Sequence, residues 1–292
     1  MLYKNFKHTK IETSGAVINL VHGGEGRPLL LLHGYPQTHV MWHATAHTLA
    51  EHFHVVCMDL RGYGDSSRPE SAPGHYAYSK RAMAQDCVEV MEALGYKSFF
   101  AAGHDRGGRV THRMALDYPD RIEAACVMDI VPTHTMFTRA DKAFATGYYH
   151  WFFLIQPDNL PEKMIGCDAE YYLKEKLRRW SASGARFDEK AVQEYVRCFS
   201  DPVSIHASCE DYRAAATIDL VHDEEDSGKK IACPLLVLWG AKGFINRTYY
   251  VIDTWREKAL DVRGNTLDCG HFLPEEKPDE VCGELIKFFT SK

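Results

Sequence analysis

The chain has 292 residues, of which 45% are hydrophobic, and its 34 lysines and arginines against 40 aspartates and glutamates give a formal net charge of −6. This length and apolar content predict a full hydrophobic core in one large domain with an insertion, or in two small domains. Charges of both signs are mixed along the chain without a basic block, so binding to nucleic acid or to an anionic membrane surface is not expected.

Neither export nor membrane insertion is indicated by the sequence. Residues 1–15 lack the apolar segment of a signal peptide, and the longest apolar runs, 29–32 and 235–239, are only as long as strands. Nine cysteines are scattered singly without a C-x-x-C pair, which suits buried thiols in a reducing compartment. We therefore expect a cytoplasmic protein without structural zinc.

Short apolar runs bounded by glycine or proline recur along the chain and predict buried strands. The first two runs flank a turn at Ser14-Gly15 and predict a hairpin over 6–21. The later runs are PLLLLHG, VVCMDLRG, SFFAAGHD, AACVMDIVP, PLLVLWG and NTLDCGH. Amphipathic segments of helical length, such as 78–94, separate most of them, and this alternation predicts a doubly wound α/β fold with a mostly parallel sheet.

The alternation stops in the middle third of the chain, where aromatic-rich helical patterns such as YYHWFF and YYLKEKLRRW occur without a convincing strand. This change predicts a helical cap over 134–230, inserted into a core formed by 1–133 and 231–292. The charged stretch 222–230 is interpreted as a solvated connector that leads back to the core.

The segment HGYP, residues 33–36, follows the first predicted parallel strand. A glycine-containing turn here can bring the backbone N–H of Tyr35 beside that of Arg106, and two such donors form an oxyanion hole. The same residues also fit a tight turn, and the two interpretations are compatible. The Tyr35–Pro36 bond is a candidate cis peptide.

The segment GHDRGGR, residues 103–109, lies between a predicted strand and a predicted helix. Its spacing of glycines around Asp105 is that of a nucleophile elbow, where hydrolases usually place serine. A carboxylate has a reference pKa of ~3.9 and is ionised at neutral pH, so it attacks without a base. Attack on a saturated carbon would leave an ester that water can hydrolyse. The alternative is that Asp105 only caps the helix.

Arg106 and Arg109 share a face of the first helical turn beside this aspartate. A neutral substrate would not need two arginines, but a substrate with its own carboxylate would, because two like charges ~4 Å apart repel by roughly 4 kcal/mol at an effective dielectric of 20. Arginine also binds carboxylates bidentately. The alternative is that both arginines form surface ion pairs.

Hydrolysis of an ester requires a general base, and His271 follows the last predicted strand. The loop after 235–239 offers no carboxylate to orient this histidine. Asp129, at the end of the preceding strand, is the candidate acid, although it could instead be a buried or capping residue.

With these residues identified, the sequence resembles the haloacetate dehalogenases of the α/β-hydrolase superfamily, close to those that act on fluoroacetate. The resemblance covers nearly the whole chain through HGYPQTHVMWH, DLRGYGDSSRP, GHDRGGRV, MDIVPT, YYHWFFLIQP, DYRAAAT and GHFLPEEKP. The combination of GHDRGGR with YHWFF is the most specific part. DLRGYGDS itself is interpreted as a structural turn.

The resemblance implies the α/β-hydrolase fold and hydrolysis of a 2-haloacetate to glycolate and halide, with water as the second substrate and no cofactor or metal. It assigns Asp105 as nucleophile, His271 as base, Asp129 as its acid, and Arg106 with Arg109 as the carboxylate clamp. It also implies a halide pocket formed by His150, Trp151 and Tyr212. Aromatic clusters of this kind often only pack in cores. Similar proteins are often homodimers, so a homodimer is a candidate state.

An epoxide hydrolase with the same Asp and His is the main alternative, because cap tyrosines can protonate an opening epoxide and Tyr148, Tyr149 and Tyr212 are available. A receptor built on a hydrolase fold is a third class. The intact set of catalytic residues argues against a receptor.

Overall fold

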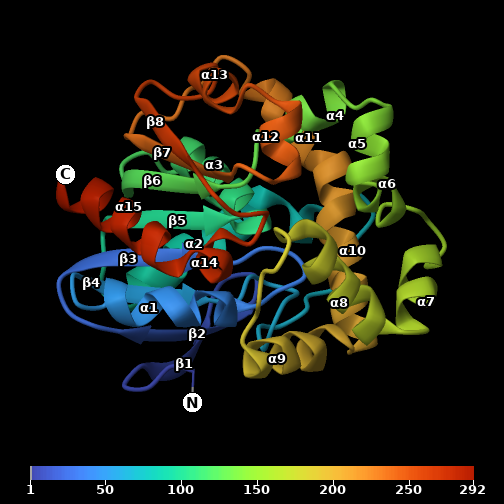
Figure 1. Ribbon diagram of the computed structural model, residues 1–292, viewed down its shortest axis with the longest axis horizontal. Helices are drawn as coiled ribbons and strands as arrows, with labels where there is room; N and C mark the ends of the chain where they lie inside the picture. The colour runs from blue at the N-terminus through green and yellow to red at the C-terminus, as the bar shows by residue number, and fades with distance from the viewer. Residues whose placement is uncertain (1) are drawn as a thin grey trace.

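A computed structural model describes residues 2–292 and contains an eight-stranded sheet in the order β1-β2-β4-β3-β5-β6-β7-β8 (Figure 1). Strands β1 and β2 form an antiparallel hairpin, and β2 also pairs antiparallel with β4, whereas β3 to β8 are mutually parallel. The strands are β1 (Lys7–Glu12), β2 (Val17–Gly23), β3 (Arg27–Leu32), β4 (Phe53–Met58), β5 (Phe99–His104), β6 (Ile122–Met128), β7 (Leu235–Gly240) and β8 (Val262–Leu267). The predicted hairpin, mostly parallel sheet and α/β class are confirmed.

Helices cover both faces of this sheet, as its buried apolar strands require. In Figure 1, α1 and α15 lie on one face and α2 and α3 on the other. Helix α2 begins after Ser79, whose side chain accepts a hydrogen bond from the backbone N–H of Ala82. The core helices are α1 (His43–Leu49), α2 (Lys80–Ala93), α3 (Arg106–Asp117), α12 (Phe244–Thr248), α13 (Val251–Arg256), α14 (Leu273–Glu276) and α15 (Pro278–Thr290), with 3₁₀ turns at His39–Trp42 and Tyr76–Tyr78.

Between β6 and β7 the chain forms helices that gather beside the carboxyl ends of the parallel strands, at the right of Figure 1. Ligand sites of open α/β sheets lie at this edge, so these helices cover the place where a site is expected. They are α4 (Thr133–Thr138), α5 (Lys142–Gly147), α6 (His150–Phe153), α7 (Leu160–Gly166), α8 (Ala169–Trp180), α9 (Glu189–Phe199), α10 (Pro202–Ala216) and α11 (Ile218–Glu225).

The interpretation of 222–230 as a solvated connector holds for its exposed second part, 227–230, but not for its first part. Helix α11 continues to Glu225, and Arg113 on α3 forms ion pairs with Asp223 at 2.8 Å and with Asp226 at 2.6 Å. Arg81 on α2 also pairs with Asp226. The charge run therefore fastens the end of the cap segment to two core helices.

Two further features bear on the expectations from the sequence. Every cysteine is unpaired, and all are buried except Cys167, which is exposed, and Cys233, which is partly exposed. None of the helices among residues 2–292 combines the length and apolar character needed to span a bilayer.

Candidate active site

Asp105 lies at the turn from β5 into α3, with a backbone φ of 46° in the left-handed region. Nearby glycines make this strained turn possible, since a Cβ on Gly103 would meet the carbonyl oxygen of Gly107 at 2.3 Å, and one on Gly107 would meet that of His33 at 2.5 Å. The Asp105 side chain makes no capping hydrogen bond to α3. The helix-cap alternative is therefore wrong, and the carboxylate projects from an elbow as the spacing of the glycines predicts.

The HGYP turn lies directly against this carboxylate. The backbone N–H of Tyr35 donates to Asp105 Oδ2 at 3.0 Å, which leaves Oδ1 as the oxygen able to attack. A Cβ on Gly34 would meet Asp105 Cβ at 2.5 Å, so only glycine allows this approach. The Tyr35–Pro36 bond is cis. Arg106, whose backbone N–H is the expected second donor, directly follows Asp105 as the first residue of α3.

The electrostatic surroundings keep Asp105 ionised. Burial alone would raise its pKa, but His271 in its protonated form, together with the charges of Arg109 and Arg106, lowers that pKa below the usual value for aspartate. The carboxylate is 7% exposed. A desolvated carboxylate that remains charged is a suitable nucleophile.

His271 lies beside this carboxylate and is held by Asp129, as the order of the strands predicts. Its Nδ1–H donates to Asp129 Oδ2 at 2.6 Å, and the backbone N–H of Gly240 donates to Asp129 Oδ1 at 2.9 Å. Burial lowers the pKa of His271, but the hydrogen bond and charge of Asp129 outweigh it and raise the pKa above 6.5. Nε2 is buried without a hydrogen-bond partner among the described residues, so it is free to accept a proton.

The two arginines are both buried, so the surface ion-pair alternative is wrong for each, but their surroundings differ. Arg106 donates from Nε and Nη2 to the carboxylate of Asp211 on α10, at 2.8 and 2.7 Å, in a bidentate fork. Asp211 also pairs with Lys80 and accepts from the hydroxyl of Tyr63. Only Nη1 of Arg106 lacks a partner in residues 2–292.

Arg109 has no carboxylate partner within the described chain. Its Nη1 donates to the carbonyl of Val131 and to Thr133 Oγ1, and its Nε is buried and unpaired. Burial, and then the charge of Arg106, lower the pKa of Arg109 to about 10. It therefore remains protonated at neutral pH and carries an uncompensated positive charge beside Asp105.

The three cap residues expected to bind halide lie over these arginines. The guanidinium of Arg106 is 4.1 Å from the ring centroid of Tyr212, and that of Arg109 is 4.6 Å from the ring of Trp151. The hydroxyl of Tyr212 and Nδ1 of His150 are both buried and have no hydrogen-bond partner among residues 2–292. These two polar atoms are therefore available to a ligand bound at this place.

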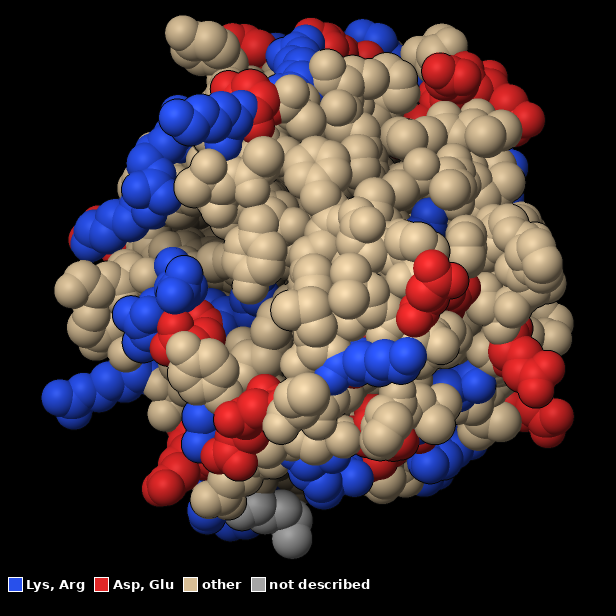
Figure 2. All heavy atoms as spheres, turned by 90° about the vertical axis from the view of Figure 1, so that its right-hand side faces the viewer, with Lys and Arg blue, Asp and Glu red and all other residues tan. Residues whose placement is uncertain are grey.

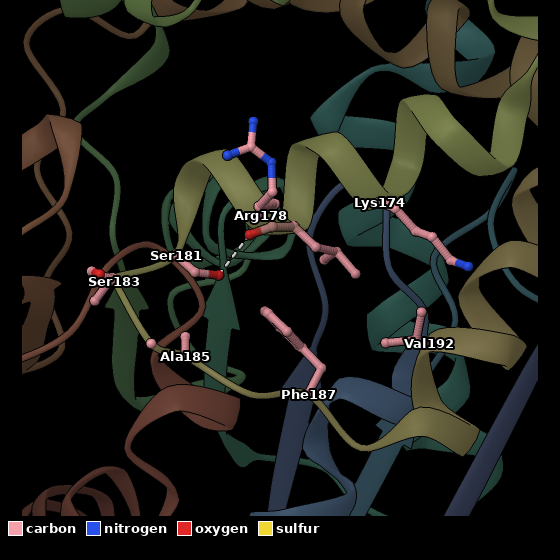
Figure 3. Close-up of a pocket in the computed structure, with 10 residues that line it drawn as sticks. Lys174, Arg178, Ser181, Ser183, Ala185, Phe187 and Val192 are labelled. Carbon is pink, nitrogen blue, oxygen red and sulfur yellow. Dashed lines mark hydrogen bonds between the residues drawn. The ribbon is translucent and has the colours of Figure 1, made fainter.

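Two pockets border this region. One of about 330 Å³ opens between the start of α6, the end of α8 and the loop after β7, and it reaches His271. A larger one of about 600 Å³ lies between α8, residues 181–187 and α9 (Figure 3). Phe187 points into the larger pocket and Arg178 points away from it (Figure 3). None of the candidate residues lines the larger pocket, whereas His271 lines the smaller one.

Reasoning from the sequence missed two groups of side chains. Asp211 and Lys80 complete the pairing of Arg106, and Trp180 at the end of α8 lies over His271 with a centroid separation of 5.4 Å. Asp211 directly precedes Tyr212 in the DYRAAAT segment, but no local pattern connects it to residue 106. No three His, Cys, Asp or Glu side chains among residues 2–292 converge as metal ligands would.

Comparisons with known proteins place the chain among hydrolases of this fold. The sequence profile of the alpha/beta hydrolase fold matches residues 27–278. A fluoroacetate dehalogenase of Burkholderia sp is 43% identical over 99% of this chain and 95% of its own length. A soluble epoxide hydrolase of Corynebacterium sp. (strain C12) is 34% identical over 97% of both chains. A crystal structure from Nostoc sp PCC 7120, assigned to the α/β hydrolases, is 60% identical over 99% of both chains with a TM-score of 0.98.

Proposed function

The chain belongs to the α/β-hydrolase fold family, and we propose that it hydrolyses a 2-haloacetate, fluoroacetate or chloroacetate, to glycolate and halide. The observation that carries the proposal is the unpaired charge of Arg109 beside the ionised Asp105. An anionic nucleophile repels an anionic substrate, and buried arginines offset that repulsion. The 43% identity to a fluoroacetate dehalogenase supports the same substrate class.

In the first step, Asp105 Oδ1 attacks the carbon that bears the halogen. The carbon–halogen bond breaks, the halide leaves with the bonding electron pair, and an ester with Asp105 forms. The substrate carboxylate accepts from Arg109 Nε–H and Arg106 Nη1–H, the two guanidinium positions that have no partner in the described structure. The leaving halide accepts hydrogen bonds from His150, Trp151 and Tyr212, donors that a negative charge requires as it develops.

In the second step, His271 Nε2 takes a proton from water, and the oxygen of that water attacks the ester carbonyl of Asp105. The tetrahedral intermediate places its negative oxygen near the backbone N–H groups of Tyr35 and Arg106. Collapse of this intermediate restores the Asp105 carboxylate and releases glycolate, with one proton passing to solvent. Asp129 stabilises the positive charge that His271 gains in this step.

Replacing His271 with alanine tests this order of events. The carboxylate attacks without a base, so H271A should form the ester and fail to hydrolyse it. Intact-mass spectrometry after incubation with haloacetate should show a carboxymethyl adduct that maps to Asp105. An unmodified protein that has also lost turnover would contradict the mechanism.

An epoxide hydrolase is the second candidate because Tyr148 and Tyr212 both lie close enough to Asp105 for its charge to raise their pKa values, after burial as the main cause. Tyr149 is 42% exposed, so it is not a partner of Tyr148 or Tyr212 in protonating an epoxide. Halide release from haloacetates, measured against diol formation from epoxides, separates the two reactions. We also propose a cytoplasmic location, from the scattered unpaired cysteines, and a homodimer, from the family resemblance. Cell fractionation would test the first and sedimentation analysis the second.

A further inference from the structure

The pocket that leads to His271 is strongly basic, although the whole chain has a net charge of −6. Four of its lining residues are cations: Lys176, Arg179, Lys242 and Arg247. None of its lining residues, all of which are described, is an aspartate or glutamate. Figure 2 shows lysine and arginine side chains around and within a hollow at the left of that face.

These four cations are not equally neutralised. Arg179 pairs with Glu175 at 2.9 Å and Lys242 pairs with Asp268 at 2.8 Å, both at exposed positions. Lys176 and Arg247 form no ion pair with any residue from 2 to 292. The pocket therefore retains positive charge, and low-dielectric walls concentrate such a field along its length.

Lys176 is the unusual member of this group because it is only 3% exposed. Its ammonium group lies over aromatic faces, 3.9 Å from the ring centroid of Tyr149, 4.9 Å from that of Tyr172 and 5.1 Å from that of Trp180. Aromatic faces offset only part of the cost of removing an ammonium group from water. Burial, and then the charge of Arg179, accordingly lower the pKa of Lys176 to about 7.

A buried cation without a carboxylate partner costs stability, and a stable fold would be served better by methionine or leucine in the same aromatic surroundings. With a pKa of about 7 the amine of Lys176 is about half protonated at neutral pH, and its position supplies a reason for keeping a group that can carry the charge. This lysine lines the pocket together with Trp180 and with His271, the neighbour of Asp105, so an anion that enters this pocket comes close to it.

We propose that this pocket is an outer carboxylate subsite, in which Lys176 binds a small monocarboxylate on its way to and from the clamp of Arg106 and Arg109. The inference rests on the proposed function for the identity of the substrate, but the subsite itself does not require turnover. Arg247 and Arg179 attract the anion to the mouth, and Lys176 receives it inside. At about 330 Å³ the pocket has ample room for a two-carbon acid.

Direct binding is tested with acetate, which carries the carboxylate but has no leaving group. In protein labelled with ¹³C at lysine Cε, the NMR signal that is missing in K176M identifies Lys176. Acetate should shift that signal saturably in the wild type and in R109L, in which the inner clamp is impaired, whereas neutral acetamide should not. The absence of a saturable shift in the Lys176 signal would overturn the proposal.

Lys174 provides a matched control on the same helix. It pairs with Glu170, lines the larger pocket of Figure 3 and does not border the basic pocket. K176M should lower kcat/KM for haloacetate about tenfold, the scale of one charge-bearing hydrogen bond, and should flatten the decline of kcat/KM with ionic strength. K174M should match the wild type in both respects.

K176R retains the charge and should recover most of the activity lost in K176M. If K176M and K174M behave alike in a folded protein, as judged by thermal melting, Lys176 serves only to pack the aromatic residues and the subsite does not exist. A wild-type protein that binds acetate at Lys176 but turns over no haloacetate would contradict the proposed function and leave the subsite standing.

Discussion

Arg109 and Arg106 lie one helical turn apart, but the structure gives them different surroundings. Arg106 forms a bidentate pair with a buried carboxylate, whereas Arg109 donates hydrogen bonds only to neutral oxygen and sulfur atoms. Substitutions at these positions should therefore affect different properties. The charge of Arg109 is available to substrate, whereas the charge of Arg106 is largely neutralised by its ion pair with Asp211 and stabilises the fold.

R109L should lower kcat/KM for haloacetate at least tenfold, because charge-bearing hydrogen bonds contribute ~1.5–3 kcal/mol. Its melting temperature should change much less, since no buried carboxylate loses a hydrogen-bond partner. R109K keeps a positive charge but lacks the planar guanidinium, so its kcat/KM should lie between those of the wild type and R109L. Steady-state kinetics and thermal melting measure both quantities, and an unchanged kcat/KM would exclude Arg109 from the carboxylate clamp.

D211N should have the opposite profile, with stability as the main loss. Asp211 is fully buried and shared by Arg106 and Lys80, and these cations hold its pKa far below the usual value despite its burial. Removing one partner of a buried ion pair typically costs ~3–5 kcal/mol, because the remaining charge has no compensation. Urea unfolding measures the free energy of unfolding of D211N and of R109L for comparison. Equal stabilities of the two variants would show that the pair of Arg106 with Asp211 contributes little to the fold.

At the scale of elements, the core was predictable because its signals are local. Each parallel strand is a short apolar run, and the elbow around Asp105 depends on glycines two positions away. The helical character of the cap was predictable, but the contacts that its helices make with the core were not. The fork from Arg106 to Asp211 joins residues 105 positions apart, and Trp180 reaches His271 from another helix. Such contacts depend on how helices pack, which short-range patterns do not encode.

The cap helices α6 and α10 bring Trp151 and Tyr212 over the arginines, and substitutions there test whether these helices bind halide or only pack. Fluoride develops a compact charge, so its departure depends on preorganised donors more strongly than that of chloride. Y212F and W151F should each slow defluorination about tenfold or more, with a smaller loss for chloroacetate. Single-turnover alkylation is the step to measure, because ester hydrolysis is common to both substrates. Equal losses for the two halides would favour packing.

At the scale of the whole molecule, the cap and core are joined at a carboxyl group. Glu275 on the core helix α14 accepts hydrogen bonds from the hydroxyl of Tyr195 on cap helix α9 and from the side chain of Gln37. Burial raises the pKa of Glu275 to about 8 against the effect of those two hydrogen bonds, whereas an unfolded glutamate titrates near ~4.3. The folded protein therefore keeps this proton over a pH range in which the unfolded chain loses it.

This difference gives a pH dependence with a definite sign. Where the folded state binds more protons than the unfolded state, stability falls as pH rises, so Glu275 should weaken the fold progressively from about pH 4 to about pH 8. E275Q has no proton to lose. Its melting temperature should consequently decline less than that of the wild type between about pH 5 and pH 8, by a few degrees, since in a domain of 150–250 residues about 1 kcal/mol corresponds to ~2–4 °C.

Glu284 on α15 offers the control for the loss of one carboxylate, because it accepts an exposed hydrogen bond from Asn265 on β8 and does not contact the cap through that bond. E284Q should keep the wild-type slope of melting temperature against pH. If E275Q keeps that slope as well, Glu275 is ionised in the folded protein, and the hydrogen bond from Tyr195 joins cap to core through a charged acceptor. Limited proteolysis provides a second test of whether Glu275 is protonated in the folded protein. If Glu275 is protonated, protease should release the cap more readily at pH 8 than at pH 6. If Glu275 is already charged, release should be no faster at pH 8.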